Sequence, residues 1–184
     1  MRVFLAGATG AIGRRLLPLL LRAGHAVTGT TRSVEKAGEL QRAGITPAVV
    51  DVYDRQGVID AMRAAQAEII IHQLTDLPQV FDPARAVTVR GAADMEQQIL
   101  GDPAIEGIVL RYGLLYGPGT WHEAPERKPA LHVDAAAHAA LLAITQGRAG
   151  IYNIADDEGI VAIDKARSAL GFDPQFRLDC DMVY

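Results

Sequence analysis

The sequence predicts an α/β protein with a doubly wound parallel sheet and a reduced C-terminal region. Three observations lead to this fold class. The first half alternates short β-rich runs with amphipathic segments, which is the pattern of a parallel sheet covered by helices. Closely spaced glycines join the first β-rich run to the first amphipathic segment, and the run Ile69-Ile70-Ile71 is typical of a strand buried on both faces.

The first half predicts a β-α-β-α-β-α-β series. Apolar residues recur at helical spacing from Ile12 to Ala23, and Gly24 is the stop signal. Pro18 lies inside this helix, where a proline removes a hydrogen bond at a cost of about 3 kcal/mol, so we expect a kink or an irregular turn. Strands are expected at residues 3–6, 26–30, 47–50 and 68–72, and helices at 12–23, 34–42 and 58–65.

The second half is less regular. Helices are expected at 92–100 and 134–145, strands at 107–111 and 151–154, and a turn at Tyr116-Gly117-Pro118-Gly119. The sequence contains no repeat, low-complexity tract or linker that would separate two units. We therefore expect one domain over residues 1–184, with a first half at 1–75 and a shortened second half at 76–184.

Composition excludes several classes of protein. The 18 Lys and Arg residues are scattered among 22 Asp and Glu residues, so nucleic acid is not an expected partner. One cysteine, Cys180, cannot build a disulfide framework or a cysteine metal site within the chain, which fits a reducing cytoplasm. There is no signal-peptide pattern and no apolar run of membrane-spanning length, so we expect a soluble cytoplasmic protein without a membrane partner.

The glycine turn Gly7-Ala8-Thr9-Gly10-Ala11-Ile12-Gly13 carries the main functional signal. Glycines between a strand and a helix allow a tight turn and let backbone N–H groups approach a pyrophosphate, while the helix N-terminus adds its positive dipole. An ordinary tight turn is the alternative interpretation. We expect residues 1–75 to be a dinucleotide-binding half, in which the cofactor contacts are Gly7, Thr9, Gly10, Ala11, Ile12 and Gly13.

The Gly-x-x-Gly-x-x-Gly spacing resembles the short-chain dehydrogenase/reductase superfamily, and residues 6–13 resemble its extended, epimerase/dehydratase-like branch. The resemblance implies a Rossmann-like fold and an NAD(P) cofactor. It also implies that Asp51 and the following Val52 lie at the adenine, and that the fourth strand ends with Leu74 beside a ribose. Later segments resemble the family in its own order, namely residues 110–119, 132–136, 150–154 and a C-terminal helix at 165–172.

The end of the second strand indicates which dinucleotide is favoured. An acidic residue there would bond the ribose 2′-hydroxyl and repel a 2′-phosphate, but this chain has Thr30-Thr31-Arg32-Ser33. The guanidinium of Arg32 suits a phosphate, with Ser33 and Lys36 near it. We therefore expect NADP rather than NAD, with NAD still possible. A solvated surface charge is the alternative interpretation of Arg32.

The family's catalytic pair is absent. The resemblance implies a tyrosine with a lysine four residues later, yet none of the five tyrosines has one, and the interval between residues 75 and 106 is shorter than in the family. We expect that the segment carrying this pair is missing, so the catalytic residues are unknown. Tyr112 and Tyr116 are weak candidates, whose pKa would stay near about 10 without a lysine, and packing is the favoured interpretation of both.

Other polar and aromatic residues give weaker signals. Trp121 and His122 could line a remnant substrate pocket, although a surface-loop role is as well supported. Asp134 is expected to cap a helix and His138 to lie on its surface, so with His132 they do not predict a metal site. The acidic run at residues 156–158 is expected to be a solvated turn rather than a calcium site.

Three functional hypotheses follow. The first is an NADP(H)-binding protein of the epimerase/dehydratase type, with oxidoreductase or epimerase ancestry and without the usual catalysis. The second is a catalytically silent dinucleotide sensor or regulatory binding protein. The third is an abbreviated form of a normal enzyme. A small-molecule substrate is possible under the first, and the sequence leaves the substrate and the oligomeric state open.

Overall fold

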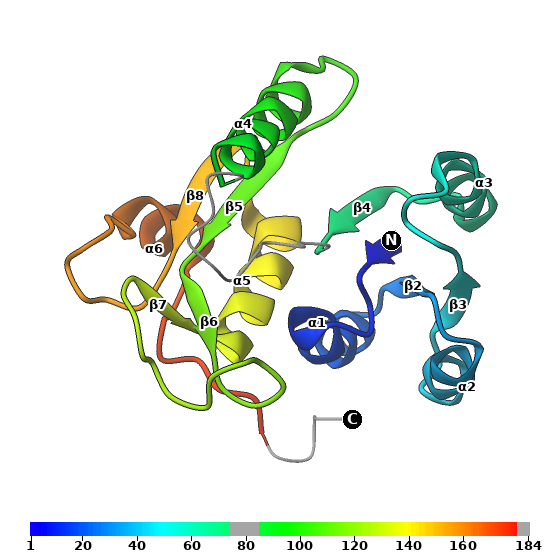
Figure 1. The fold of residues 1–184 in the computed structure, drawn as a ribbon, viewed down its shortest axis with the longest axis horizontal. Helices are drawn as coiled ribbons and strands as arrows, with labels where there is room; N and C mark the ends of the chain where they lie inside the picture. Colours follow the sequence, from blue (N-terminus) through cyan, green and yellow to red (C-terminus); the bar gives the residue numbers. More distant parts are fainter. Residues whose placement is uncertain (74–84, 180–184) are drawn as a thin grey trace.

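The computed structural model describes residues 1–73 and 85–179 of the chain. Eight strands and six helices are seen in the described residues (Figure 1). In chain order they are β1 (Arg2–Ala6), α1 (Ala11–Arg22), β2 (Ala26–Thr31), α2 (Val34–Arg42), β3 (Thr46–Val49), α3 (Arg55–Ala65), β4 (Ile69–His72), α4 (Arg85–Gly101), β5 (Ile108–Tyr112), β6 (Leu114–Tyr116), β7 (Ala130–His132), α5 (Val133–Gln146), β8 (Gly150–Ile154) and α6 (Asp164–Leu170).

The first four strands form a parallel sheet in the order β3-β2-β1-β4. The chain runs outward from β1 to β3 and then returns to the other side of β1. Because parallel crossovers are right-handed, this reversal puts α3 on the opposite face of the sheet from α1 and α2, as Figure 1 shows. The fold is therefore the doubly wound α/β fold that the sequence predicts.

The remaining strands form two separate parallel pairs, β5-β8 and β6-β7. Within the described residues, β4 pairs with β1 and β5 pairs with β8, and no hydrogen-bonded ladder joins β4 to β5. The short strands β6 and β7 were not predicted, because three residues are too few to establish a period. The second half is consequently a set of short pairs arranged around α5.

The expectation that Ile69-Ile70-Ile71 is buried on both faces is wrong. Ile70 is 59% exposed, while Ile69 and Ile71 are partly buried against the main core. Paired residues of parallel strands point to the same face, so Ile70 shares its face with Phe4 of β1. As the last strand of its sheet, β4 has less cover on that face than β1 has.

Of the kink or irregular turn expected at Pro18, the irregular turn is wrong. α1 is continuous from Ala11 to Arg22, and Pro18 is buried inside it. A proline in a helix sacrifices a backbone hydrogen bond, but the apolar side chains around Pro18 anchor both halves of this helix in the core. Tertiary packing therefore offsets the local cost.

The core joins the two halves of the molecule through α1 and α5. The first turns of α5 are rich in alanine and almost completely buried, so this helix can approach α1 closely. Side chains from β1, α1, α5 and β8 belong to one apolar cluster. Among the described residues, no helix is long and apolar enough to cross a membrane.

Candidate dinucleotide site

The glycine turn leaves the carboxyl end of β1 and enters α1. Gly7 has a positive φ of 90°, which favours glycine, and the N–H of Gly10 donates to the Gly7 carbonyl at 3.0 Å. The N–H of Gly7 donates to Thr30 Oγ1 of β2, also at 3.0 Å. The turn is therefore tight and fixed against the neighbouring strand.

Two glycines are required by packing. A Cβ on Gly13 would overlap the backbone of Gly7 and Ala8, so only glycine allows α1 to approach the turn this closely. A Cβ on Gly29 of β2 would lie 2.7 Å from the Cβ of Ala8. These two positions hold the turn in place, whichever ligand it binds.

Gly10 differs from these two glycines because it is exposed. A Cβ there would meet only the Gly7 carbonyl oxygen, at 3.3 Å, and would otherwise extend the surface of the turn. The first N–H groups of a helix have no partner within the helix, and α1 begins directly after Gly10. The turn thus presents bare backbone and a helix N-terminus at one open surface, which fits a pyrophosphate.

The other expected residues of the turn differ in what they present. Thr9 and Ala11 are partly exposed, whereas the side chain of Ile12 is buried in the core, which leaves its backbone N–H as the group available to a ligand.

Arg14 was not identified from the sequence. Its Nε donates to the carbonyl of Thr9 at 3.0 Å, and the side chain is exposed, so a cation lies on the glycine turn. The only sequence signal was a basic residue directly after the third glycine.

Arg32 and Ser33 lie where β2 ends and α2 begins. Arg32 is exposed, and the Ser33 Oγ caps α2 by accepting from the N–H of Lys36 at 3.2 Å. The N–H of Ser33 in turn donates to Thr31 Oγ1 at 3.2 Å. An exposed guanidinium and a second helix N-terminus therefore occur together at the end of β2.

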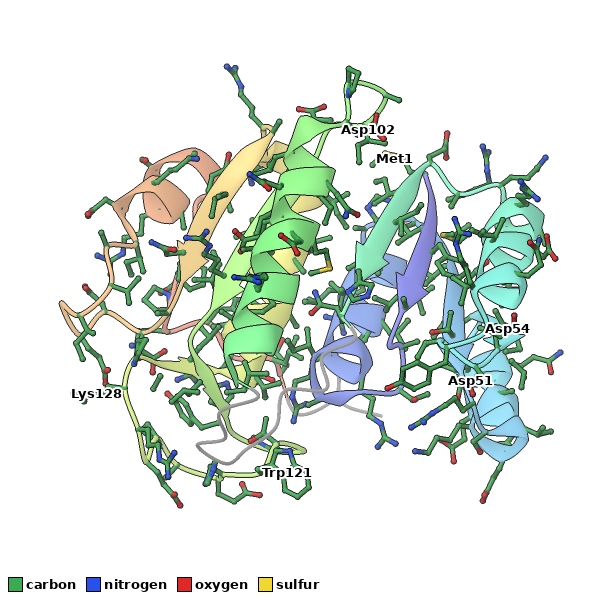
Figure 2. The ribbon with its side chains drawn as sticks, turned by 45° about the horizontal axis from the view of Figure 1, so that its top comes forward. Met1, Asp51, Asp54, Asp102, Trp121 and Lys128 are labelled. Carbon is green, nitrogen blue, oxygen red and sulfur yellow. The ribbon has the colours of Figure 1, made fainter. Side chains whose placement is uncertain are left out.

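Asp51 and Val52 leave β3 at the same edge, because Thr31 of β2 is in register with Val49 of β3. Asp51 is exposed and its Oδ1 accepts from the N–H of Tyr53 at 3.1 Å, while Val52 is partly buried. Figure 2 shows Asp51 and Asp54 toward the end of the molecule opposite Met1. Leu74, expected beside the ribose, lies outside the described residues.

The Tyr112 hydroxyl forms hydrogen bonds to two different parts of the fold. Its hydroxyl donates to the Ala136 carbonyl and accepts from Gln73 Nε2, both at 3.3 Å, so it connects the end of β4 with α5. Burial raises the pKa of Tyr112 to about 12, and the expectation of a value near 10 is therefore wrong. A phenol in this environment stays protonated at neutral pH and is a poor general base.

The side chain of Tyr116 contacts a histidine and an arginine rather than a lysine. Its ring meets His132 edge to face with a centroid distance of 5.1 Å, and Arg177 Nη2 donates to its hydroxyl at 3.4 Å. Burial raises the pKa of Tyr116, and the adjacent carboxylate of Asp156 raises it further, although the Arg177 guanidinium opposes this. Neither candidate tyrosine has the activated phenol that a catalytic acid–base group requires.

Two expectations at α5 are wrong. His132, rather than Asp134, caps the helix, because His132 Nδ1 accepts from the N–H of Asp134 at 3.2 Å. His138 is not a surface imidazole, since it is partly buried and stacks on Phe176 with a centroid distance of 3.8 Å. Asp134 instead forms an ion pair with Arg15, 2.9 Å away.

The acidic run at 156–158 is partly structural. Asp157 forms an ion pair with Arg167 at 2.8 Å, and Glu158 forms one with Lys128 at 3.2 Å. These two carboxylates therefore contact two other segments of the chain as well as solvent. In the part of the chain that the structure describes, no group of three His, Cys, Asp or Glu residues could hold a metal ion.

Comparison with known families identifies the kind of cofactor. A family model described as NAD(P)H-binding matches residues 7–98, which begin at the first glycine of the turn. The chain belongs to this NAD(P)H-binding family. Its cofactor is therefore a nicotinamide dinucleotide, and the proteins to which the chain is similar include a reductase and epimerases.

Three known proteins illustrate what the chain is similar to. A 3-diazoavenalumate denitrifying reductase of Streptomyces is 29% identical over 238 aligned positions, covering 86% of this chain and 77% of the relative. UDP-glucose 4-epimerase of Thermotoga maritima has the same fold, with a TM-score of 0.70 at 15% identity, covering 96% of this chain and 94% of the epimerase. The yeast methylglyoxal/isovaleraldehyde reductase complexed with NADPH gives a TM-score of 0.57 at 16% identity, covering 85% of this chain and 76% of the reductase.

Proposed function

We propose that the chain is an NADPH-dependent reductase whose substrate accepts a hydride without needing a proton from a tyrosine and lysine pair. The observation that carries this proposal is the similarity to the Streptomyces denitrifying reductase, which spans most of both chains. That relative is named for action on a diazo compound. A substrate of that class removes the need for the catalytic pair that this sequence lacks.

The residues proposed to hold the cofactor surround one edge of the sheet. Gly7 to Gly13 would hold the pyrophosphate through backbone N–H groups, and the Arg14 guanidinium adds a cation at the same turn. Arg32 and Ser33 would hold the 2′-phosphate, which favours NADP over NAD. Asp51, Val52 and Leu74 complete the proposed site at the adenine and ribose. The bound dinucleotide supplies a hydride.

Two substrate classes, carbonyl compounds and aryl diazonium ions, differ in whether their reduction by hydride also needs a proton. Reduction of a carbonyl group needs a hydride on carbon and a proton on oxygen, and positioned acids typically contribute about 10²- to 10⁴-fold to such a rate. An aryl diazonium ion that gains a hydride yields the arene and N₂, with charge and atoms balanced and no proton required. The raised pKa values of Tyr112 and Tyr116 make each phenol a weaker proton donor, so they favour the second class.

We further propose that the catalytic segment of the family is missing between β4 and β5. The alignment with the Streptomyces reductase is longer than this chain, so the relative contains residues without a counterpart here. The lack of a ladder between β4 and β5 in the described residues is what the loss of an intervening strand would produce. Residues 1–75 would then carry the dinucleotide and residues 76–184 the shortened substrate region.

A matched pair of substrates tests this function. The purified chain is given NADPH with 4-carboxybenzenediazonium or with 4-carboxybenzaldehyde, and NADPH absorbance and N₂ release are followed against a protein-free control. We expect turnover of the diazonium ion only, retained in the Tyr112→Phe/Tyr116→Phe variant and lost in Gly10→Val. Faster turnover of the aldehyde would contradict the proposal. Tight NADPH binding without any turnover would favour the silent sensor instead.

A further inference from the structure

The sole tryptophan of the sequence stands on a well-fixed turn and is exposed to solvent. Trp121 is 83% exposed, whereas tryptophan is usually among the more buried residues. The Gly117 N–H donates to the His122 carbonyl at 2.7 Å, which closes the turn around Trp121. Thr120 Oγ1 lies 2.7 Å from the Gly117 carbonyl oxygen and 2.9 Å from that of His122. The indole is thus presented by a rigid support without being packed.

The same turn is tied to the helix of the cofactor site. Arg15 Nη2 donates to the Pro118 carbonyl at 2.7 Å, and the Arg15 side chain is only 6% exposed. Arg15 lies in the second turn of α1, two residues after Gly13 of the glycine turn. A buried cation therefore fixes the support of Trp121 to the end of α1 where the dinucleotide is proposed to bind.

The position of the Trp121 indole agrees with a role at the carboxyl edge of the sheet. β1 begins next to Met1 and ends at the glycine turn, so the carboxyl edge of the sheet lies away from Met1. Figure 2 shows Trp121 and Asp51 toward one end of the molecule and Met1 and Asp102 toward the other. Ligands of doubly wound sheets bind outside the carboxyl ends of the strands, which is the end at which Trp121 lies.

We propose that the Trp121 indole is the platform on which a planar aromatic ring of the substrate stacks. This inference rests on the proposed reductase function and specifies its substrate as an aromatic compound. An exposed indole face offers a large rigid contact at little conformational cost, and stacked rings gain attraction beyond the area they bury. Arg15 is a positioning residue for this platform, because it acts through the Pro118 carbonyl.

Binding of a neutral probe pair tests the platform without turnover. Cinnamamide and 3-cyclohexylpropanamide differ in ring planarity and unsaturation, and each is titrated into the chain without NADPH by ligand-observed NMR. Because the chain has one tryptophan, quenching of the indole emission reports this site directly. We expect the aromatic amide to bind roughly threefold to tenfold more tightly than its saturated analogue. Trp121→Leu should remove this preference and Trp121→Phe should keep most of it.

Controls separate the platform from the cofactor site and from self-association. Ile160→Ala, which changes another exposed apolar side chain, should keep the preference, and Trp121→Leu should bind NADPH as the unchanged chain does. Equal affinity of the two amides, or a preference that survives Trp121→Leu, would overturn the inference. So would a loss of dimers in Trp121→Leu with unchanged ring binding, which would identify an interface between copies. Failure of NADPH to bind would instead overturn the proposed function, since the probe titration is independent of it.

Discussion

Arg15 Nε lies 2.9 Å from Asp134 Oδ1, and both side chains are at least nine-tenths buried. The contact is an ion pair rather than an aligned hydrogen bond, and each partner has a second role. Arg15 also donates to the Pro118 carbonyl, and Asp134 Oδ2 accepts from the N–H of Leu178 at 3.2 Å. Through this pair α1, α5, the Trp121 turn and the C-terminal segment are held together.

Removing one partner of this pair should be strongly destabilising. Asp134→Ala leaves the Arg15 guanidinium buried without its counter-charge, which typically costs about 3 to 5 kcal/mol in the free energy of unfolding. Urea denaturation measures the change. The matched control is Asp157→Ala, because the pair between Asp157 and Arg167 is partly exposed and should contribute at most about 1 kcal/mol. Equal losses in both variants would mean that the buried pair has no special role.

Two glycines of the turn should respond differently to substitution. Gly10→Val adds a side chain to an exposed position, so the fold should lose only about 1 kcal/mol, mainly from the weaker helix cap, while NADPH binding is abolished. Gly13→Ala forces a Cβ into the backbone of Gly7 and should lower stability by about 1 to 3 kcal/mol or more. Calorimetric titration and thermal unfolding measure the two effects. A Gly10→Val variant that binds NADPH normally would remove the glycine turn from the site.

The parallel sheet and the glycine turn could be predicted because both depend on local signals. Alternation of β-rich and amphipathic runs specifies parallel crossovers, and the glycine turn needs only its own residues between β1 and α1. The exposure of Ile70 could not be predicted, since an apolar run is the same for an edge strand as for a central one.

The errors at Tyr112, His132 and His138 arise from contacts between distant parts of the chain. The pKa of Tyr112 depends on burial between β4 and α5, which no local pattern encodes. His138 is covered by Phe176 from the C-terminal segment. His132 caps α5 because the helix begins at Val133, which puts Asp134 inside the first turn, where it pairs with Arg15.

Arg32→Ala should discriminate between the two dinucleotides. Loss of a charge-assisted contact costs about 1.5 to 3 kcal/mol, so NADPH affinity should fall about tenfold or more while NADH affinity changes little. Isothermal titration with each cofactor measures this difference. Arg42→Ala is the control, because Arg42 is exposed in the last turn of α2, at the opposite end of that helix from Ser33. Equal weakening of both cofactors by Arg32→Ala would show that Arg32 does not contact the 2′-phosphate.

Stability should decrease as the pH falls below about 6.5. Burial lowers the pKa of His25, His132 and His138 in the folded chain, so the unfolded chain binds protons more strongly in this range. The contribution is present above the unfolded value near 6.5 and is lost as the pH falls through the folded values. His138→Phe keeps the ring stacked on Phe176 and should lose less stability than the unchanged chain between pH 8 and pH 5. If the free energy of unfolding changes equally with pH in His138→Phe and in the unchanged chain, His138 does not contribute to this pH dependence.

Alkaline pH should test the buried state of Tyr112. Its pKa is raised to about 12 in the folded chain against about 10 when unfolded, so the folded state holds the phenolic proton more tightly. The resulting stabilisation, about 2 to 3 kcal/mol, is complete below pH 10 and is lost as the pH rises through 12. Tyr112→Phe should therefore lose less stability than the unchanged chain when urea unfolding is compared at pH 9 and pH 11. Tyr53→Phe, which changes a tyrosine that is 78% exposed, should behave as the unchanged chain does. If Tyr112→Phe and the unchanged chain lose the same stability between these two pH values, the Tyr112 phenol ionises as easily in the folded chain as in the unfolded one, and its exclusion as a general base would no longer hold.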